Sequence, residues 1–155
     1  MNLASLLSKD RINLSLDAGK KDEVIKDLVY AIKKGAEAEL IVSTLLKREE
    51  LGSTGIGKGI AIPHCRSLAV EKLEIAVGRT KKPVNFNAID KKPVSLLFLI
   101  IAPPQDPGNQ YLITLGKVVQ IAKEITKKNL IQKPETPEDF ITMINDIEKG
   151  LAKRK

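Results

Sequence analysis

The chain contains the segment Val94-Ser-Leu-Leu-Phe-Leu-Ile-Ile-Ala102, in which Ser95 is the one polar residue. A strand with one solvated face alternates apolar and polar side chains, whereas a continuous apolar run is typical of a strand buried on both faces. Pro103 and Pro104 follow directly and end it, because proline cannot donate to the hydrogen bonds of a sheet. We therefore predict a central strand here, covered on both sides by other elements.

Periodic apolar patterns on both sides of this strand predict an alternation of strands and helices. Alternating residues predict further strands at 12–16 and 73–77, the second of them covered on one face. Apolar residues spaced three and four apart predict four helices, which contain residues 24–32, 40–45, 112–122 and 140–147. Strands interleaved with helices define an α/β fold, in which the sheet lies between helices. The pattern alone does not give the order of the strands.

Length and composition describe one globular domain that spans residues 1–155. Apolar residues make up 43% and charged residues 29% of the chain, which is ordinary for such a protein. One cysteine excludes an internal disulfide framework. The first residues are too short an apolar stretch for a signal peptide, and the longest apolar run is far shorter than the roughly 18 residues that cross a bilayer. We expect a cytoplasmic protein without direct membrane insertion.

The net charge of +7 raises the question of a nucleic-acid partner. Lysines are scattered over every segment, and neither interleaved aromatic residues nor a known binding motif accompanies them. Charge by itself bears on solubility and non-specific association. A basic nucleic-acid-associated domain is therefore the weakest alternative, and we expect a solvated lysine-rich surface and no nucleic-acid partner.

A glycine-rich segment precedes the only histidine of the chain. Residues 52–64 are Gly-Ser-Thr-Gly-Ile-Gly-Lys-Gly-Ile-Ala-Ile-Pro-His. The four glycines allow turns and close backbone approaches that other residues resist. Residues 60–62 are typical of a short buried strand, which Pro63 ends. We expect the His64 imidazole on a loop at the strand end, beside backbone amides that are free to face an anion.

The segment Arg48-Glu49-Glu50-Leu51, together with residues 52–64, resembles the active-site signature of enzyme IIA of the bacterial sugar phosphotransferase system, of the fructose–mannitol and nitrogen-regulatory type. Residues 86–90 and 93–98 resemble the strand region that follows in that family, and the similarity extends over residues 3–147. The resemblance implies the mannitol-type enzyme IIA fold, a mixed sheet of about five strands sandwiched between helices.

The resemblance also implies a function for His64. In the family this histidine accepts a phosphoryl group from the histidine-containing phosphocarrier protein, then passes it to an enzyme IIB or uses it as a regulatory signal. A neutral imidazole is nucleophilic near pH 7, and the transition state of the transfer spreads negative charge over the phosphoryl oxygens. The protein has to position the groups and compensate this charge. We expect no cofactor. Because no enzyme IIB motif or membrane-spanning enzyme IIC region is joined to the sequence, we also expect a stand-alone phosphotransferase component.

Arg48 is the candidate for charge compensation, because its planar guanidinium can hold two phosphoryl oxygens and stays charged at any working pH. The matching arginine of the family lies next to the active histidine. The alternative interpretation of the sequence is that Arg48 is simply a solvated cation in the last turn of a helix. Glu49 either orients Arg48 or lies at the surface, and the pattern does not separate these roles.

Three more residues of the glycine-rich segment are candidates for a supporting role. Ser53 and Thr54 either donate hydrogen bonds to the phosphoryl group or cap the turn. Gly59, like the other glycines, is interpreted as a backbone device. Cys65 follows His64 and raises a thiol–histidine hydrolase or a metal site. Consecutive residues of an extended chain point to opposite sides, and one histidine with one cysteine is too few for a zinc pattern, so we expect no metal.

The chain departs from the family where many members carry a second histidine, at the start of the helix after the central strand. The aligned residue here is Tyr111, which can form a hydrogen bond but carries no positive charge at neutral pH. This difference supports an alternative, a regulatory docking protein of the same fold whose phosphorylation is weak or vestigial. The sequence does not separate sugar transport from nitrogen-related regulation.

Four apolar residues near the motif are candidates for a docking collar around His64. A collar of this kind would suit transient contacts with protein partners, whereas burial of the same side chains would make them part of the core. We expect core positions for all four, which are Ile56, Ile60, Leu68 and Leu112.

Overall fold

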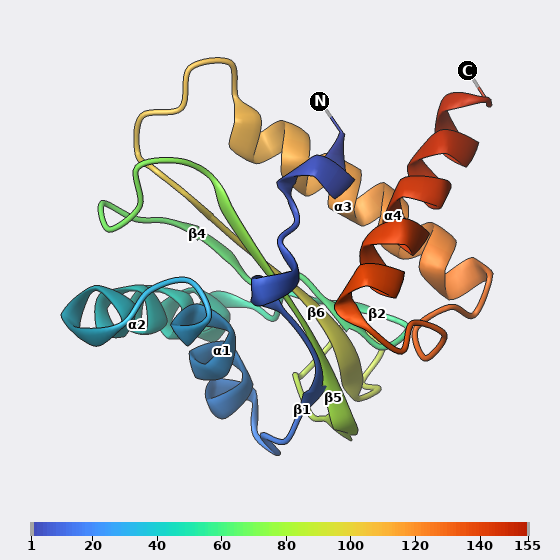
Figure 1. Ribbon diagram of the computed structural model, residues 1–155. Helices are drawn as coiled ribbons and strands as arrows, with labels where there is room; N and C mark the ends of the chain where they lie inside the picture. The colour runs from blue at the N-terminus through green and yellow to red at the C-terminus, as the bar shows by residue number, and fades with distance from the viewer. Residues whose placement is uncertain (1, 155) are drawn as a thin grey trace.

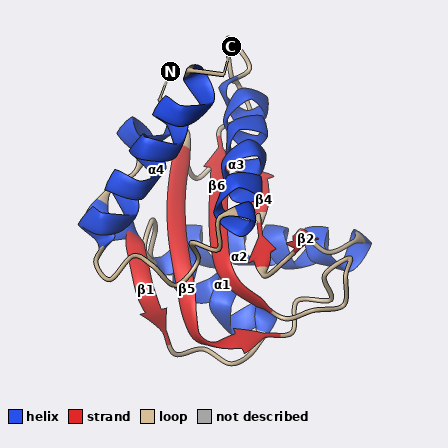
Figure 2. Cartoon of the chain, turned by 90° about the vertical axis from the view of Figure 1, so that its right-hand side faces the viewer, coloured by secondary structure: helices blue, strands red, loops and turns tan. Residues whose placement is uncertain are grey.

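A computed structural model describes residues 2–154 and shows a sheet between two layers of helices (Figures 1 and 2). The strands are β1 (Ile12–Leu16), β2 (Gly55–Gly57), β3 (Ile60–Ala61), β4 (His64–Arg66), β5 (Glu74–Val84) and β6 (Val94–Ala102). The helices are α1 (Lys21–Tyr30), α2 (Gly35–Leu51), α3 (Gln110–Lys127) and α4 (Pro137–Ala152), preceded by short 3-10 turns at Leu3–Leu6 and Lys9–Arg11. The α/β prediction is confirmed.

The sheet is mixed and has six strands. Its order is β1-β5-β6-β3-β2, and β4 also pairs with β6. β5 and β6 are antiparallel, whereas β1 runs parallel to β5, and β3 and β4 run parallel to β6. The sheet has one strand more than expected because two short strands, β3 and β4, share the same edge of β6, with Ile62 and Pro63 between them.

The central strand β6 has the bounds that the apolar run predicts and is buried on both faces. Its side chains alternate between two cores. Leu97, Leu99 and Ile101 pack in the cluster that α1 and α2 cover. The intervening residues Leu96, Phe98 and Ile100 pack with α3 and α4. Because β6 is held between two cores, the strands that pair with it are fixed on a rigid edge.

Two expectations about burial are wrong. The strand at 73–77 is covered on both faces, because in β5 Ile75 and Val77 face α3 and α4 while Ala76 faces α1 and α2. The apolar stripe predicted for α3 is displaced, and the buried residues of this helix are Tyr111, Thr114, Val118, Ile121, Ala122, Glu124 and Ile125. The Asp106 carboxylate accepts hydrogen bonds from the first amides of α3, and this start turns Tyr111 inward and leaves Leu112 outside.

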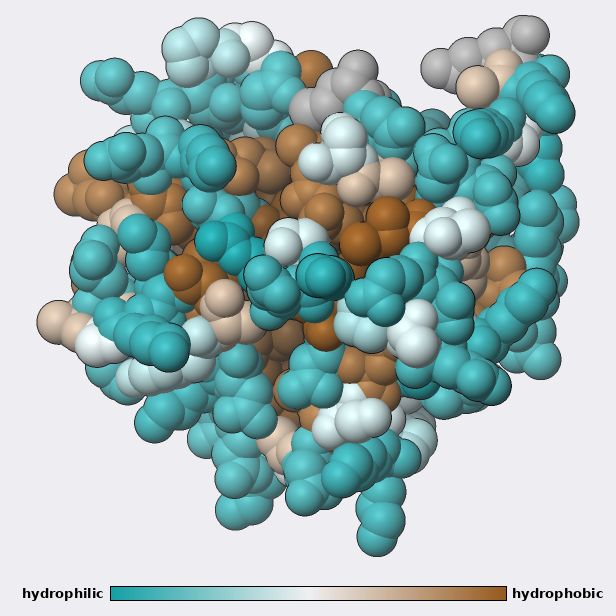
Figure 3. All heavy atoms as spheres, in the orientation of Figure 1, coloured by the Kyte–Doolittle hydropathy of each residue, from teal (hydrophilic) through white to brown (hydrophobic). Residues whose placement is uncertain are grey.

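Figure 3 shows hydrophilic side chains along most of the outline of this face, with apolar side chains in its middle and at part of the left edge. Within residues 2–154, no helix has both the length and the apolar character that crossing a bilayer requires.

Gly55 in β2 tests how tightly the glycine-rich segment is packed. A Cβ at this position would lie 2.7 Å from the Cβ and 2.9 Å from the Cα of Ala88, closer than atoms can approach. We expect Gly55→Ala to lower the free energy of unfolding by about 1–3 kcal/mol, because overpacking forces the backbone to shift. Urea denaturation measures this change.

Gly116 in α3 is the matched control, because a Cβ there meets no atom within 4 Å. Gly116→Ala should stabilise the protein by about 0.5–1 kcal/mol, since alanine restricts the unfolded chain. Equal effects of the two substitutions would contradict the close packing at Gly55.

Candidate functional site

His64 is the first residue of β4 and pairs with Ile100 of β6. The expectation of a loop position at a strand end is therefore wrong. Pro63 interrupts the edge strand because it has no amide hydrogen, but its carbonyl oxygen accepts a hydrogen bond from the Ile100 amide at 3.0 Å. The chain thus stays on β6, and the rigid sheet positions the backbone of His64.

A backbone contact determines the tautomer of His64. Its Nδ1 lies 2.7 Å from the carbonyl oxygen of Ile62. A carbonyl oxygen only accepts, so Nδ1 carries the hydrogen of this bond. In the neutral ring the lone pair is then on Nε2. The imidazole is partly exposed, and its nucleophilic nitrogen is Nε2.

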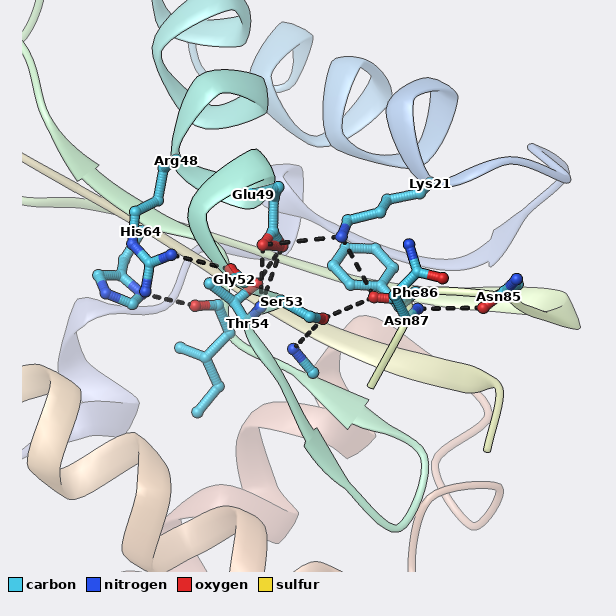
Figure 4. A network of polar contacts seen from close by, with 12 residues as sticks. Lys21, Arg48, Glu49, Gly52, Ser53, Thr54, His64, Asn85, Phe86 and Asn87 are labelled. Atoms are coloured by element: carbon cyan, nitrogen blue, oxygen red, sulfur yellow. Dashed lines mark hydrogen bonds and ion pairs between the residues drawn. The ribbon is translucent and has the colours of Figure 1, made fainter. Parts of the chain in front are cut away.

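Arg48 lies on α2, which packs against β4, the strand that begins with His64. It lies in the last turn of the helix, as predicted, and its Nη1 donates to the carbonyl oxygen of Gly52 at 2.8 Å. Figure 4 shows its side chain extending from the helix towards His64. The structure thus brings a guanidinium from the end of α2 towards the imidazole at the start of β4.

Glu49 has neither of the two roles considered for it. Its side chain is 5% exposed and turns away from Arg48, into the glycine-rich segment (Figure 4). The carboxylate accepts hydrogen bonds from the Thr54 amide, at 2.9 and 3.2 Å, and from the Thr54 hydroxyl. The Lys21 ammonium of α1 lies 3.8 Å away and compensates its charge. Glu49 therefore ties the segment after α2 to both helices.

Ser53 completes this network. Its hydroxyl donates to the carbonyl oxygen of Phe86 and accepts from the Gly55 amide at 3.0 Å. Lys21 donates to the same Phe86 carbonyl at 3.2 Å and lies 4.7 Å from the centre of the Phe86 ring. The hydroxyls of Ser53 and Thr54 thus make bonds within the protein, in agreement with the turn-stabilising alternative.

Several backbone amides of the segment are also occupied, which is contrary to expectation for these positions. Those of Thr54 and Gly55 bond to Glu49 and Ser53, and the Lys58 amide bonds to Asp90 at 2.8 Å. The segment therefore holds the site together without offering these amides to an anion.

Gly59 lies in the turn between β2 and β3 with φ +88°, in the left-handed region that favours glycine. Its carbonyl oxygen accepts from the amides of Ser95 and Leu96, at 2.8 and 3.0 Å. Gly59 thus fastens the hairpin to the start of β6.

Tyr111 lies against His64, with 6.0 Å between ring centres and 56° between ring planes. Its amide bonds to Asp106 at 2.9 Å, and its side chain is 9% exposed. Burial raises the pKa of the phenol to about 12; Cys65 also raises this pKa, and the Arg66 and Arg48 cations lower it. Tyr111 is therefore a neutral group beside His64.

Arg66 is a charged neighbour of the site that the sequence reasoning missed. Its guanidinium carbon lies 4.6 Å from the centre of the Tyr111 ring. Nη1 donates to the Pro103 carbonyl oxygen at 2.9 Å and lies 3.6 Å from an Asp106 carboxylate oxygen. The sequence contains a sign of this position. Arg66 follows His64 by two residues, and residues two apart on a strand share a face.

Cys65 lies on the opposite face and packs with the cluster covered by α1 and α2, so the structure forms no thiol–histidine dyad. Burial raises the pKa of its thiol to about 11. Within the described residues, 2–154, no group of three or more His, Cys, Asp or Glu side chains could hold a metal ion.

Residues 5–147 match the family described as phosphoenolpyruvate-dependent sugar phosphotransferase system, EIIA 2. The chain belongs to this enzyme IIA family. It is 32% identical to the fructose-specific EIIABC component of Bacillus subtilis over 153 residues, which are 96% of this chain and 24% of that relative. The enzyme IIA chain therefore spans about a quarter of the length of that multidomain protein.

Two solved structures of enzyme IIA proteins have the same fold. Nitrogen regulatory protein IIA-Ntr from Neisseria meningitidis superimposes with a TM-score of 0.83 at 28% identity, over 92% of this chain and 98% of the other. IIA mannitol from Escherichia coli gives 0.72 at 22% identity, over 89% and 98%. The mannitol-type enzyme IIA fold is confirmed.

The expectation that four apolar residues near the enzyme IIA motif are core is wrong for three of them. Ile60 is fully buried in β3. Leu68 is 87%, Leu112 59% and Ile56 41% exposed. Ile56 lies in the short hairpin β2–β3, Leu68 follows β4, and Leu112 lies on the outer side of α3, so the two helix layers do not cover them.

The buried thiol of Cys65 predicts a loss of stability in alkali. Its pKa is 9.0 in an ordinary environment and about 11 in the folded state, so the folded state holds the proton more tightly. This contribution is complete below pH 9.0 and disappears as the pH rises through 11. Between pH 7 and 10 it decreases by about 1 kcal/mol.

Urea denaturation of the wild type and Cys65→Ala at both pH values measures this contribution. The free energy of unfolding of the variant should fall by about 1 kcal/mol less than that of the wild type, since lysine and tyrosine titration affects both proteins. Parallel pH dependences would contradict the burial of the thiol.

Proposed function

We propose that this enzyme IIA chain is a phosphohistidine carrier, in which Nε2 of His64 accepts a phosphoryl group from the histidine-containing phosphocarrier protein. The observation that supports this proposal most is the bond between Nδ1 of His64 and the Ile62 carbonyl oxygen, because it leaves the lone pair of the neutral ring on Nε2. An imidazole held in one tautomer by a strand is ready to attack without reorientation.

The step is an exchange of one phosphorus–nitrogen bond for another. Nε2 of His64 attacks the phosphorus while the bond to the donor imidazole breaks. The donor ring leaves as neutral imidazole when its other nitrogen carries a proton, and Nδ1 of His64 keeps its proton, which it donates to the Ile62 carbonyl oxygen. The product is a phosphoimidazolium stabilised by that carbonyl, which retains the capacity to transfer the group onward.

Arg48 is proposed to bind the oxygens of the transferred group. One nitrogen of its guanidinium bonds to Gly52, which anchors the side chain and leaves other N–H groups for the phosphoryl oxygens. Glu49, Ser53, Thr54 and Gly59 are proposed to act indirectly, because their bonds hold the segment between α2 and β4. In this proposal the glycine-rich segment sets geometry and Arg48 supplies charge.

The receiver is proposed to be an enzyme IIB or a regulatory target protein. The compared relatives include a fructose-specific component and a nitrogen regulatory protein, at 32% and 28% identity, so similarity supports both classes of receiver to a similar degree. Exposed apolar side chains at Leu68 and Leu112 suit transient contact with a protein in either case.

Tyr111 supports a second candidate, a regulatory docking protein whose phosphorylation is weak. A phenol whose pKa is about 12 supplies no positive charge to a phosphoryl group at neutral pH. If transfer depends on a charge at that position, this chain exerts its effect through docking.

The direct test is the intact mass of the protein after incubation with phosphoenolpyruvate, enzyme I and phosphocarrier. Wild type should gain one acid-labile phosphoryl group, and His64→Ala should gain none, because the chain has no other histidine. The donors are shown to be active on another enzyme IIA in parallel. No gain with active donors would contradict the carrier function and support the docking candidate.

Removing the guanidinium of Arg48 should slow the transfer. We expect Arg48→Gln to reduce the single-turnover rate about 10- to 100-fold, the effect of losing a hydrogen bond to a charged group. The measurement is rapid-quench labelling from phosphorylated phosphocarrier. Lys47→Gln is the control, since Lys47 is exposed on the neighbouring position of α2 and its loss changes the net charge equally. Equal rates for the two variants would show that Arg48 does not bind the phosphoryl group.

A further inference from the structure

The site needs more positive charge than Arg48 supplies. A phosphoryl group on His64 carries about two negative charges near neutral pH. The amides of Thr54, Gly55 and Lys58 are bonded within the protein. At the start of α3, the amides of Gln110 and Tyr111 are bonded to Asp106, at 3.1 and 2.9 Å. These five amides are therefore not available to the phosphoryl group, and a second cationic side chain is the natural source of further charge compensation.

Arg66 has the position that such a side chain requires. It shares the outer face of β4 with His64, because the two residues are two apart on the strand. The Tyr111 ring contacts both, with 6.0 Å between its centre and that of the imidazole and 4.6 Å between its centre and the guanidinium carbon. Tyr111 thus lies close to both side chains, and Arg66 and His64 are neighbours on the same face of β4.

The guanidinium of Arg66 is anchored through one of its nitrogens. Within the described residues 2–154, its hydrogen bond to Pro103 and its ion pair with Asp106 are both made through Nη1. Arginine has five N–H donors, so Nη2 and Nε keep theirs for another acceptor. The anchoring limits the conformations of a long side chain before any phosphoryl group arrives. The cations of Arg66 and Arg48 both act on the Tyr111 phenol, so their fields overlap at this point.

We propose that Arg66 binds the phosphoryl group on His64 opposite Arg48, so that two guanidinium groups compensate its charge. This inference rests on the phosphohistidine function proposed above. Tyr111 positions Arg66 through its ring and is neutral, while the arginine charge is permanent. Many enzyme IIA proteins have a second histidine where this chain has Tyr111. In this proposal Arg66, which lies next to Tyr111, supplies the positive charge that the tyrosine lacks.

The experiment measures phosphoryl transfer from phosphorylated phosphocarrier by rapid quench, over a range of carrier concentrations. Wild type, Arg66→Gln, Arg66→Lys and Lys72→Gln are compared. Lys72 is exposed in the connection between β4 and β5, and its substitution is the matched control for net charge. Thermal unfolding of each variant shows that the fold is retained.

Arg66→Gln should lower the maximal rate about 10- to 100-fold and leave the half-saturating carrier concentration unchanged. Arg66→Lys should recover part of the rate, because it keeps the charge without the planar fork. A maximal rate equal to that of Lys72→Gln would overturn the role of Arg66, and so would a change confined to the half-saturating concentration, which indicates docking. If wild type itself accepts no phosphoryl group, the carrier function fails, and the inference fails with it.

Discussion

The hydrogen bond between the Ile62 carbonyl and Nδ1 of His64 is the contact on which the site depends. It exists because β3 ends before Pro63 and β4 begins at His64, both on the edge of β6. The break turns one carbonyl towards the imidazole while Pro63 keeps the chain attached to β6. The long apolar strand in the centre of the sheet thus determines the ring nitrogen available for chemistry.

The glycine-rich segment has a mechanical role in this account. Its hydroxyls and several of its amides are bonded to Glu49, Phe86 and Asp90, and Gly55 lies too close to Ala88 for any side chain. A segment held by internal bonds changes little when an anion binds nearby. In the proposed function, position and charge are therefore supplied by different residues, the first by the segment and the second by the arginines.

The sequence predicts much of the fold, because burial leaves a local pattern. The bounds of β6 follow from its apolar run, and the end of α2 at Gly52 follows from its spacing and glycine. The buried side of α3 is harder to predict, because Asp106 fixes the first turn of the helix through hydrogen bonds that the apolar periodicity does not show. The family motif identifies His64 as the candidate nucleophile. The partners of Glu49 include Lys21 of α1, and the position of Arg66 depends on its contact with Tyr111 of α3. The sequence pattern does not show such contacts between distant elements.

The most direct test of the central claim is the tautomer of His64, measured by long-range ¹H–¹⁵N NMR on the unphosphorylated protein above the pH at which its ring is protonated. The single histidine makes the assignment unambiguous. The account predicts a protonated Nδ1 and a pyridine-type Nε2, because Nδ1 donates to Ile62. A hydrogen on Nε2 would contradict it, since the fold would then leave the other nitrogen as the nucleophile.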